Sequence, residues 1–406
     1  MSVLTSLYAG MSGMEAYQQG LAVIGNNTAN LNTAGFKFTE PVFEDVATDS
    51  GTSGFPGSPG TPTTGGGVQI DSTHVSFSQG NEESTGDPLD AAINGLGFFM
   101  VDLNGTTYYT RNGAFQLDST GNLVETTTGA KVLVSTSTSA NGTFNVNAYN
   151  SYPPKATTTI QLSGNLAHTG QTTSYNLPGI TVVDGAGGTE TLQASFTQST
   201  TNPLSWTIQV NDSTGTSVGS GTILFNADGS PDASNTPIQL SVTPSGLPAF
   251  TVNLEIGTAG SFSGVTSLNT AASSQLQVAS QDGVQLGSLT GTSFANDGSL
   301  TLTYSNGKTL TPAKLLLAQF NAPQQLQELS QGLFAATSGA TPLVGTPQST
   351  NFGNIVGGEI EMSNVDLSQQ FTELIVIQRG YQASSQITSI ANDMMQQLLT
   401  MGNNHG

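Results

Sequence analysis

Hydrophobic residues recur at helical spacing near the start of the chain. Residues 3–31 are predicted to form a helix whose apolar positions are Leu4, Leu7, Met11, Met14, Leu21 and Ile24. Intervals of three and four place side chains on one face of a helix, and their repetition predicts a coiled-coil seam with polar and small interruptions. Ser2 is expected to cap the start of this helix, and Gly35 to stop it.

The same rhythm returns near the end of the chain. Residues 364–401 are predicted to form a helix with apolar positions at Leu367, Phe371, Leu374, Ile377, Tyr381, Ile387, Ala391, Met394, Leu398 and Met401. Asp366 followed by Gln369, and Ser363 followed by Asp366, resemble capping boxes. Both stripes are narrow and each helix needs a partner. The two helices either meet each other and neighbouring copies, or they are core elements of a globular fold.

Between the helices the pattern changes to that of short strands. Residues 50–67 are a Gly-, Pro-, Ser- and Thr-rich linker. Residues 98–125 predict a β-meander with turns at Asn104-Gly105, Asn112-Gly113 and Thr120-Gly121, and residues 299–320 predict a hairpin turning at Asn306-Gly307. Residues 157–295 are Thr- and Ser-rich and predict a separate β domain.

These patterns predict a mixed fold, with terminal α-helices forming an axial coiled coil and two mainly-β outer domains. The expected parts are an axial helical domain (1–33 and 364–406), a connector (34–70 and 357–363), a discontinuous β domain (71–156 and 296–356) and an inserted outer β domain (157–295).

The charge composition excludes several kinds of partner. Only 8% of the 406 residues are charged, against about a quarter in ordinary proteins, and the net charge is −20 with seven Lys and Arg. Binding to nucleic acid or to an anionic membrane surface needs clustered cations, so neither is expected. No apolar run is long enough to span a membrane. No Lys or Arg precedes Lys37, so a conventional cleaved signal peptide is not expected.

Short motifs in the chain do not indicate an enzyme. The absence of Cys excludes disulfides and thiolate sites. GTSVG at 215–219 matches the nucleophile-elbow pattern around Ser217, but strand-like sequence follows it and a turn between strands is expected instead. NGLGF at 94–98 lacks the third glycine of a phosphate cradle, and NADGSPD at 226–232 lacks the final acidic residue of a calcium loop. The three histidines His74, His168 and His405 have no metal-like spacing, so no cofactor or metal is expected.

Helices at both ends that bracket a β-rich body favour a self-assembling subunit. A heterologous contact that repeats without closing produces a helical filament. The low charge of the stripes suits burial in such an assembly, and the acidic body keeps it soluble.

Three stretches of the chain resemble bacterial flagellar rod and hook proteins. They are LYAGMSGMEAYQQGLAVIGNNTANLNTAGFKFTE near the start, DPLDAAINGLGFFMV with YYTRNGAFQLDSTGNLV in the body, and SNVDLSQQFTELIVIQRGYQASSQITSIANDMMQQLL near the end. Residues 157–295 are not covered by the resemblance. Because rod members generally lack a large insert, this insert favours the hook members of the family.

The resemblance implies a structural role in the hook, a short curved tube that joins rod to filament as a universal joint and transmits torque. It implies a homopolymer whose helices line the inner tube, export through the flagellar type III apparatus without cleavage, and an extracellular location in the flagellum. Its implied partners are rod proteins, the hook cap and the hook–filament junction proteins.

Other functions stay open at this point. A distal rod protein of the same family is the nearest alternative, and imaging of the polymer separates a curved tube from a straight one. From different classes, the chain could be a secreted serine hydrolase using Ser217 or an adhesin-like surface protein with helical anchors.

The stretch ANLNTAGFKFTE, residues 29–40, is predicted to connect the axial helix with the outer body. Gly35 is expected to adopt the left-handed conformation. If the stretch is extended, Phe36 and Phe38 share one side and Lys37 points away, where it either pairs with an acidic group of an adjacent subunit or stays solvated. The connector residues are Asn30, Asn32, Gly35, Phe36, Lys37 and Phe38.

Overall fold

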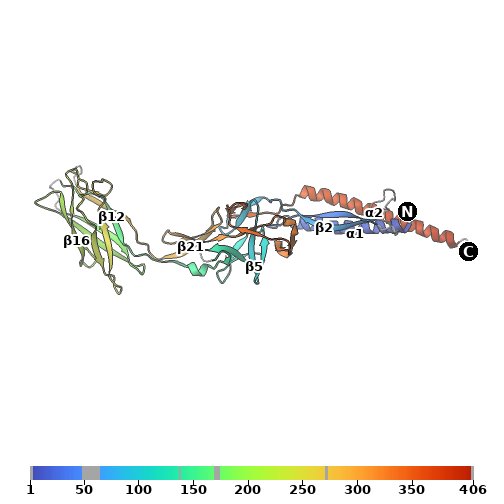
Figure 1. The fold of residues 1–406 in the computed structure, drawn as a ribbon, viewed down its shortest axis with the longest axis horizontal. Coiled ribbons are helices and arrows are strands. Elements are labelled where there is room, and N and C mark those ends of the chain that lie inside the picture. The colour runs from blue at the N-terminus through green and yellow to red at the C-terminus, as the bar shows by residue number, and fades with distance from the viewer. Residues whose placement is uncertain (1–2, 48–64, 137–138, 169–173, 270–272, 404–406) are drawn as a thin grey trace. The chain divides into compact units, whose positions relative to one another are not determined.

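The structure is a computed structural model that describes residues 3–47, 65–136, 139–168, 174–269 and 273–403 (Figure 1). The chain forms two compact units. The first comprises Met1–Ala148, Thr292–Leu302 and Leu310–Gly406, and the second comprises Tyr149–Gly291 and Thr303–Thr309. Ser2, His405 and most of the predicted 50–67 linker lie outside the described residues.

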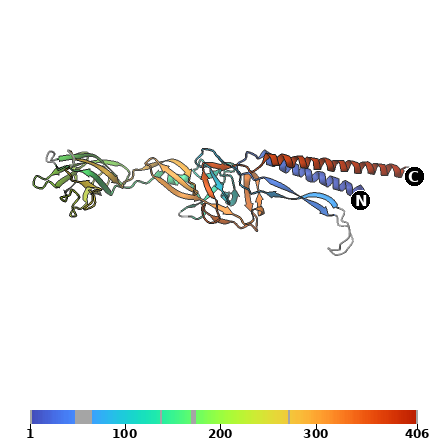
Figure 2. The same ribbon diagram turned by 90° about the horizontal axis from the view of Figure 1, so that it is seen from above.

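Two long helices belong to the first unit, as predicted. Helix α1 spans Val3–Ala29 and helix α2 spans Leu367–Asn403, and they lie side by side (Figure 2). The side chain of Asp366 caps α2, because its carboxylate accepts hydrogen bonds from the backbone N–H groups of Ser368 (2.7 Å) and Gln369 (3.3 Å). The reciprocal half of the predicted capping box is wrong, since the Gln369 side chain instead donates to Glu373 (3.0 Å).

A β-hairpin lies against α1 within the stretch that was expected only to connect. Strand β1 (Thr39–Ala47) pairs with β2 (Gly65–Val75) in antiparallel register. The ring centroids of Tyr17 on α1 and Phe43 on β1 are 5.5 Å apart, and the Val68 N–H donates to the Ser12 hydroxyl oxygen (3.2 Å). The hairpin therefore covers part of α1.

The β body of the first unit is built on one large sheet and two small two-stranded sheets. Its strands include β5 (Phe98–Leu103), β6 (Thr106–Thr110), β7 (Phe115–Leu117), β8 (Leu123–Glu125), β9 (Lys131–Thr136), β10 (Gly142–Thr143), β24 (Leu317–Gln319), β25 (Leu326–Glu328), β26 (Leu333–Ala336) and β27 (Leu343–Gly345). The small sheets pair β3 (Glu82–Ser84) with β29 (Glu359–Glu361), and β4 (Ala91–Asn94) with β28 (Asn354–Gly357). Edge-to-face aromatic rings, such as Phe98 against Phe320 and Phe334, fill the core.

Three of the four predicted turns are correct. Asn104 and Gly105 both have positive φ and join β5 to β6, as the twist of a two-residue hairpin requires. Gly121 turns β7 into β8, and Gly307 turns β22 (Ser299–Tyr304) into β23 (Thr309–Leu315). The turn predicted at Asn112-Gly113 is wrong, because β6 pairs with β5 and β26 while β7 pairs with β8. Asn112 is instead buried and hydrogen-bonded to Glu125.

The second unit contains two sheets that enclose their own core. One is an antiparallel meander of β13 (Ser174–Val183), β14 (Thr189–Gln198), β15 (Ser205–Asn211) and β16 (Ser217–Leu224). The other orders β17 (Ile238–Val242), β18 (Phe250–Glu255), β12 (Thr159–Asn165) and β19 (Val265–Thr266), with β20 (Gln275–Gln281) also on β12. Strands β12 and β18 run parallel. Inward-facing apolar side chains alternate with outward polar ones, and Trp206 is fully buried among them.

The remaining elements are short or lie where the two units divide. They are strands β11 (Ser151–Tyr152) and β21 (Gly287–Phe294) and three 3₁₀ turns, Val146–Tyr149, Pro323–Gln325 and Ser330–Gly332. The four-part division predicted from the sequence stays a proposal.

The separate core of the second unit generates a prediction. Trp206→Ala should remove about 3–5 kcal/mol from the stability of that unit, because it empties a fully buried indole site. In differential scanning calorimetry, we expect one transition to move to lower temperature and the transition of the first unit to stay in place. Trp206→Phe, which keeps an aromatic ring, should have a smaller effect. Equal movement of both transitions would contradict independent cores.

Candidate assembly site on the terminal helices and their junction

The two helices contact each other through small residues. The buried positions of α1 are Gly10, Gly13, Ala16, Gly20, Ile24 and Asn27. On α2 the buried positions recur every seven residues, at Gln370, Ile377, Ser384 and Ala391. A seven-residue repeat keeps one face of a helix turned to its partner. These positions define the intrachain seam.

Glycine lets the two helices approach closely in the intrachain seam. A Cβ atom added to Gly13 would lie 2.5 Å from the Ser384 hydroxyl oxygen, and one added to Gly20 would lie 2.9 Å from Cδ1 of Ile377. On α2, a Cβ at Gly380 would lie 2.5 Å from the Tyr17 ring. These contacts pair residues of increasing number on α1 with residues of decreasing number on α2, so the helices run antiparallel.

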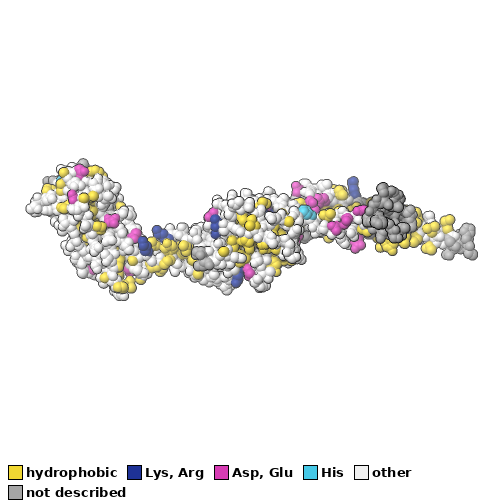
Figure 3. Space-filling model, in the orientation of Figure 1, with side chains coloured by type: hydrophobic (Ala, Val, Ile, Leu, Met, Phe, Trp, Pro, Cys, Tyr) yellow, Lys and Arg dark blue, Asp and Glu magenta, His cyan; other side chains and the backbone are white. Residues whose placement is uncertain are grey.

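Three of the predicted apolar positions, Ile24, Ile377 and Ala391, lie in the intrachain seam, but most of the larger ones lie elsewhere on the helices. Four of them are half-buried, namely Leu7, Met14, Leu21 and Leu374. The others are exposed, namely Leu4, Met11, Leu367, Phe371, Tyr381, Ile387, Met394, Leu398 and Met401. Figure 3 shows hydrophobic side chains gathered over the C-terminal part of α2. The structure therefore separates the intrachain seam from a second, larger apolar surface on the same two helices.

A buried carboxylate joins three segments of chain where the helices meet the β body. Glu361 Oε1 lies 2.5 Å from Lys37 Nζ and accepts a hydrogen bond from the Gly80 N–H (2.8 Å). Its Oε2 lies 3.1 Å from Nη1 of Arg111. The side chains of Lys37 and Glu361 are completely buried and that of Arg111 almost so. Residues from the connector, from β29 and from the body thus share one ionic cluster, which we call the Glu361 cluster.

The two buried cations of the Glu361 cluster depend on the negative charge of Glu361. Burial lowers the pKa of Lys37 and of Arg111 because the charged forms lose hydration, and the attraction of Glu361 offsets part of this effect. Lys37 Nζ also donates to the Ser78 carbonyl (2.7 Å), and Arg111 Nη2 to the Gly95 carbonyl (2.8 Å). The Arg111 guanidinium lies 5.4 Å from the centre of the Phe98 ring. One carboxylate balances two cations.

The predicted surroundings of Lys37 were therefore wrong. Lys37 is not solvated and does not depend on an adjacent subunit for an acidic partner. It pairs with Glu361, which lies 324 residues later in the same chain. Sequence spacing contains no signal for a contact of this range. Phe36 is buried and Phe38 half-buried, so all three side chains of the FKF stretch pack into the junction.

Gly35 has the left-handed backbone predicted for it, with φ of 69°. It lies beyond the end of α1, and a Cβ there would come within 2.8 Å of the Asn112 Cα, so the position also needs glycine for close approach. Its N–H donates to the Glu361 carbonyl (2.7 Å). Asn364 extends this link, accepting from the Phe38 N–H (2.8 Å) and donating to the Ser76 carbonyl (2.9 Å).

A second polar link joins both helices to the hairpin, through a residue that sequence analysis did not single out. The buried amide of Asn27 donates to the Thr39 carbonyl (2.8 Å) and to Gln370 Oε1 (2.9 Å), and it accepts from the Thr39 N–H (3.0 Å). Of the predicted connector residues, Asn30 hydrogen-bonds locally to the Asn26 carbonyl (3.0 Å) and Asn32 is exposed.

Candidate chemical sites give little support for catalysis. Ser217 begins strand β16 after a turn capped by Asp212, so the GTSVG motif is a turn between strands, as predicted, and not a strand–helix elbow. Among the described residues, no three His, Cys, Asp or Glu side chains are grouped to hold a metal ion. None of the described helices is long and apolar enough to cross a membrane.

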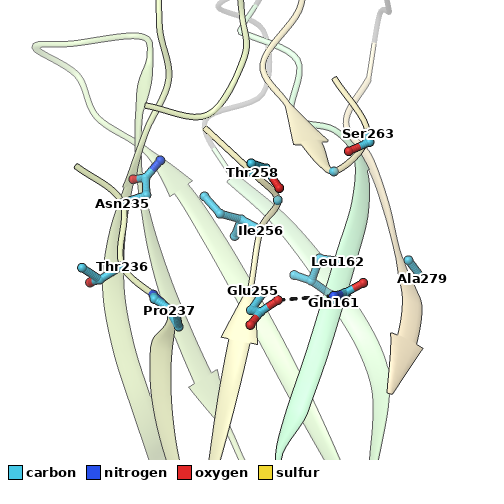
Figure 4. Close-up of a pocket in the computed structure, with 12 residues that line it drawn as sticks. Gln161, Leu162, Asn235, Thr236, Pro237, Glu255, Ile256, Thr258, Ser263 and Ala279 are labelled. Atoms are coloured by element: carbon cyan, nitrogen blue, oxygen red, sulfur yellow. Dashed lines mark hydrogen bonds between the residues drawn. The ribbon is translucent and has the colours of Figure 1, made fainter. Parts of the chain in front are cut away.

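A cavity of about 230 Å³ opens in the second unit beside β12, β17 and β18 (Figure 4). The one carboxylate in its lining, Glu255, accepts a hydrogen bond from Gln161 (3.3 Å). The remaining lining is uncharged.

Comparison with known proteins connects these features to one family. Three protein-family profiles match: "Flagella basal body rod protein" over residues 7–37, "Flagellar hook protein FlgE/F/G D1 domain" over residues 92–166, and "Flagellar basal body rod FlgEFG protein C-terminal" over residues 356–401. The flagellar hook proteins FlgE of Salmonella typhimurium LT2 and Escherichia coli K12 are each 31% identical, over 96% of this chain and 98% of theirs. That of Borreliella burgdorferi is 28% identical over 99% of this chain and all of its own. The solved Helicobacter pylori flagellar hook protein FlgE2 is 14% identical with a TM-score of 0.46, over 67% of this chain and 98% of its own.

The Glu361 cluster predicts that neutralising one carboxylate will strongly reduce the stability of the first unit. Glu361→Gln should cost about 3–5 kcal/mol of the free energy of unfolding of the first unit, because it leaves two buried cations without an anion. Lys37→Met should cost less, since Arg111 still pairs with Glu361. Urea unfolding of both variants checks this order. An unfolding curve for Glu361→Gln that matches the wild type would contradict the proposed dependence on the carboxylate.

The intrachain seam predicts that alanine substitutions at two glycines of α1 will affect the stability of the helix pair differently. A methyl group in Gly10→Ala would lie within 3.0 Å of the Ser384 carbonyl oxygen and should push the helices apart. Gly25→Ala is the matched control, because nothing lies within 4 Å of its added Cβ and alanine favours the helix by about 0.5–1 kcal/mol. Amide hydrogen exchange in α1 should quicken in the first variant and stay equal or slow in the second. Equal exchange in both would argue against close packing.

Proposed function

This chain belongs to the flagellar hook protein family and is a structural subunit of the flagellar hook, and on this premise we propose that its copies polymerise through their terminal helices. The observation that carries this proposal is the exposed apolar surface of α1 and α2, on helices whose mutual contact is already filled by small residues.

Burial of this surface supplies the driving force for assembly. Met11 is 50% exposed, Phe371 55% and Ile390 58%. Complete burial of one such side chain is worth about 1.5–3 kcal/mol, so several of them together can offset the loss of freedom on association. Because the helices present different surfaces to each side, the contact between copies is heterologous, and repetition without closure gives a helical tube.

The junction suits the transmission of torque. The Glu361 cluster and the Asn27 amide cross-link α1, the hairpin, the start of α2 and the β body. Buried polar networks that are satisfied in only one arrangement favour a rigid geometry. In this proposal, the helices form the stiff axial part and the junction holds each body firmly to it.

Bending requires outer contacts that exchange easily. The surface of the second unit is dominated by Thr, Ser and Asn, and its ion pair Lys155–Asp282 has a side-chain exposure of 59% at the lysine. Exposed pairs of this kind contribute little, and small polar contacts between neighbouring copies would re-form as the tube curves. This supports the role of a flexible universal joint.

The proposal also assigns the parts of the chain to the assembly. Residues 1–33 and 364–406 form the axial layer and 157–295 the outermost β layer, with the connector and discontinuous β domain between them. Membership of the family supports export by the flagellar type III apparatus, an extracellular position, and contacts with rod, cap and junction proteins.

Imaging of the purified chain tests the proposal. We expect electron microscopy to show curved, flexible tubes after polymerisation. A straight, rigid tube would instead identify a distal rod protein of the family, and failure to form any polymer would contradict self-assembly.

Charged substitutions on the exposed helix surface should prevent assembly. Met11→Asp and Phe371→Asp should each raise the critical concentration at least tenfold, because a carboxylate would be buried in the contact between copies. Gln116→Glu, at an exposed polar position of strand β7 and away from both helices, is the control and should polymerise nearly normally. Circular dichroism should show the β body intact in all three. Normal polymerisation of both Asp variants would exclude these helix surfaces from the contact.

A further inference from the structure

One row of exposed residues follows α1 on the side opposite its intrachain seam. Leu4, Tyr8, Met11 and Glu15 succeed one another at intervals of four, three and four residues, and all four are exposed. The intrachain seam residues Gly13 and Gly20 lie on the other side, against α2. Glu15 is the single charged residue in Val3–Ala29. We call Leu4, Tyr8, Met11 and Glu15 the outer row.

A matching stripe follows α2. Val376, Ala383, Ile387 and Ile390 recur at intervals of seven, four and three, and all are exposed. Arg379 lies three residues after Val376 and four before Ala383, so it sits beside this stripe on the helix surface. It is the one cation in Leu367–Asn403. We call Val376, Ala383, Ile387 and Ile390 the α2 stripe.

Glu15 and Arg379 are complementary charges that the fold keeps apart. Both lie between the levels marked by the contacts Gly13–Ser384 and Gly20–Ile377, but each is exposed on the face of its helix that is turned away from the seam. Neither forms an ion pair within the part of the chain that the structure describes. Covering either residue alone would bury a charge without a partner, which is costly.

We propose that the outer row of one copy packs on the α2 stripe of a second copy, with Glu15 paired to Arg379. This inference rests on the proposed function, and it specifies which faces meet. If the helices of different copies run antiparallel, as within the chain, the register that brings Glu15 to Arg379 also places Leu4 opposite Ile390 and Met11 opposite Ala383. At Met11 and Ala383 a long side chain then faces a small one, and both apolar pairs lie on the side of the ion pair toward the start of α1.

Charge reversal tests this pairing. Glu15→Lys and Arg379→Glu should each raise the critical concentration for polymerisation at least about fivefold, because each sets two like charges against each other. The double variant restores opposite charges and should return to within about twofold of the wild type. Asp393→Lys is the matched control, since Asp393 would lie beyond the start of α1 in this register and its reversal should change little. Circular dichroism of each free chain shows whether it has folded.

Disulfide cross-linking between introduced cysteines provides a second test of the contact. Because the native sequence has no Cys, every disulfide must join introduced residues. Glu15→Cys with Arg379→Cys in one chain should give, on mild oxidation of polymer, a ladder of disulfide-linked copies on a non-reducing gel. Glu15→Cys with Asp393→Cys should give no ladder. Both readouts use the full chain.

The outcomes separate this inference from the proposed function. A wild-type chain that does not polymerise would overturn both. If the wild-type chain polymerises, three results would each overturn the pairing alone. They are single charge reversals that leave the critical concentration unchanged, a double variant that polymerises no better than the worse single variant, and the absence of a disulfide ladder.

Discussion

The close approach of the two terminal helices is the constraint on which the rest of the structure depends. Helices with glycine, alanine and serine on the touching faces can bring their backbones together, but those residues bury little apolar surface. Many of the larger apolar side chains of the same helices, such as Leu4 and Phe371, are left exposed in the part of the chain that the structure describes. The same packing thus pairs the two helices and leaves apolar surface on them exposed. A subunit of a polymer requires such a surface for contact with other copies.

A buried carboxylate couples this helix pair to the β body. Glu361 holds Lys37 and Arg111, and the Asn27 amide reaches the hairpin and α2 at the same end of α1. Such polar contacts are costly to break one at a time, because each leaves buried groups unpaired. In the proposed tube, the junction would carry a load between the helices and the β body, and the lightly charged surface of the second unit would make contacts that exchange easily.

The sequence predicted the elements well and the contacts between them poorly. Period-3.6 and period-2 patterns are local, so both helices, the strand-rich body and the hairpin at Asn104-Gly105 follow from them. The apolar pattern did not show which positions meet within the chain, because Gly13 and Ser384 make the close contact there while Leu4 and Phe371 stay exposed. The pairing of Lys37 with Glu361 spans 324 residues, and no local pattern encodes it. Asn112-Gly113 has turn chemistry, yet burial of Asn112 against Glu125 overrides it.

Oxidation of methionine measures most directly whether the exposed helix surface is an assembly surface. Met11, Met394 and Met401 are 50%, 40% and 67% exposed in the free chain, while Met100 is 3% exposed and serves as the internal reference. Mild peroxide treatment of free chain and of polymer, read residue by residue by mass spectrometry, should show the three helix methionines oxidised in the free chain and strongly protected in the polymer. Equal oxidation of these methionines in both states would contradict the account.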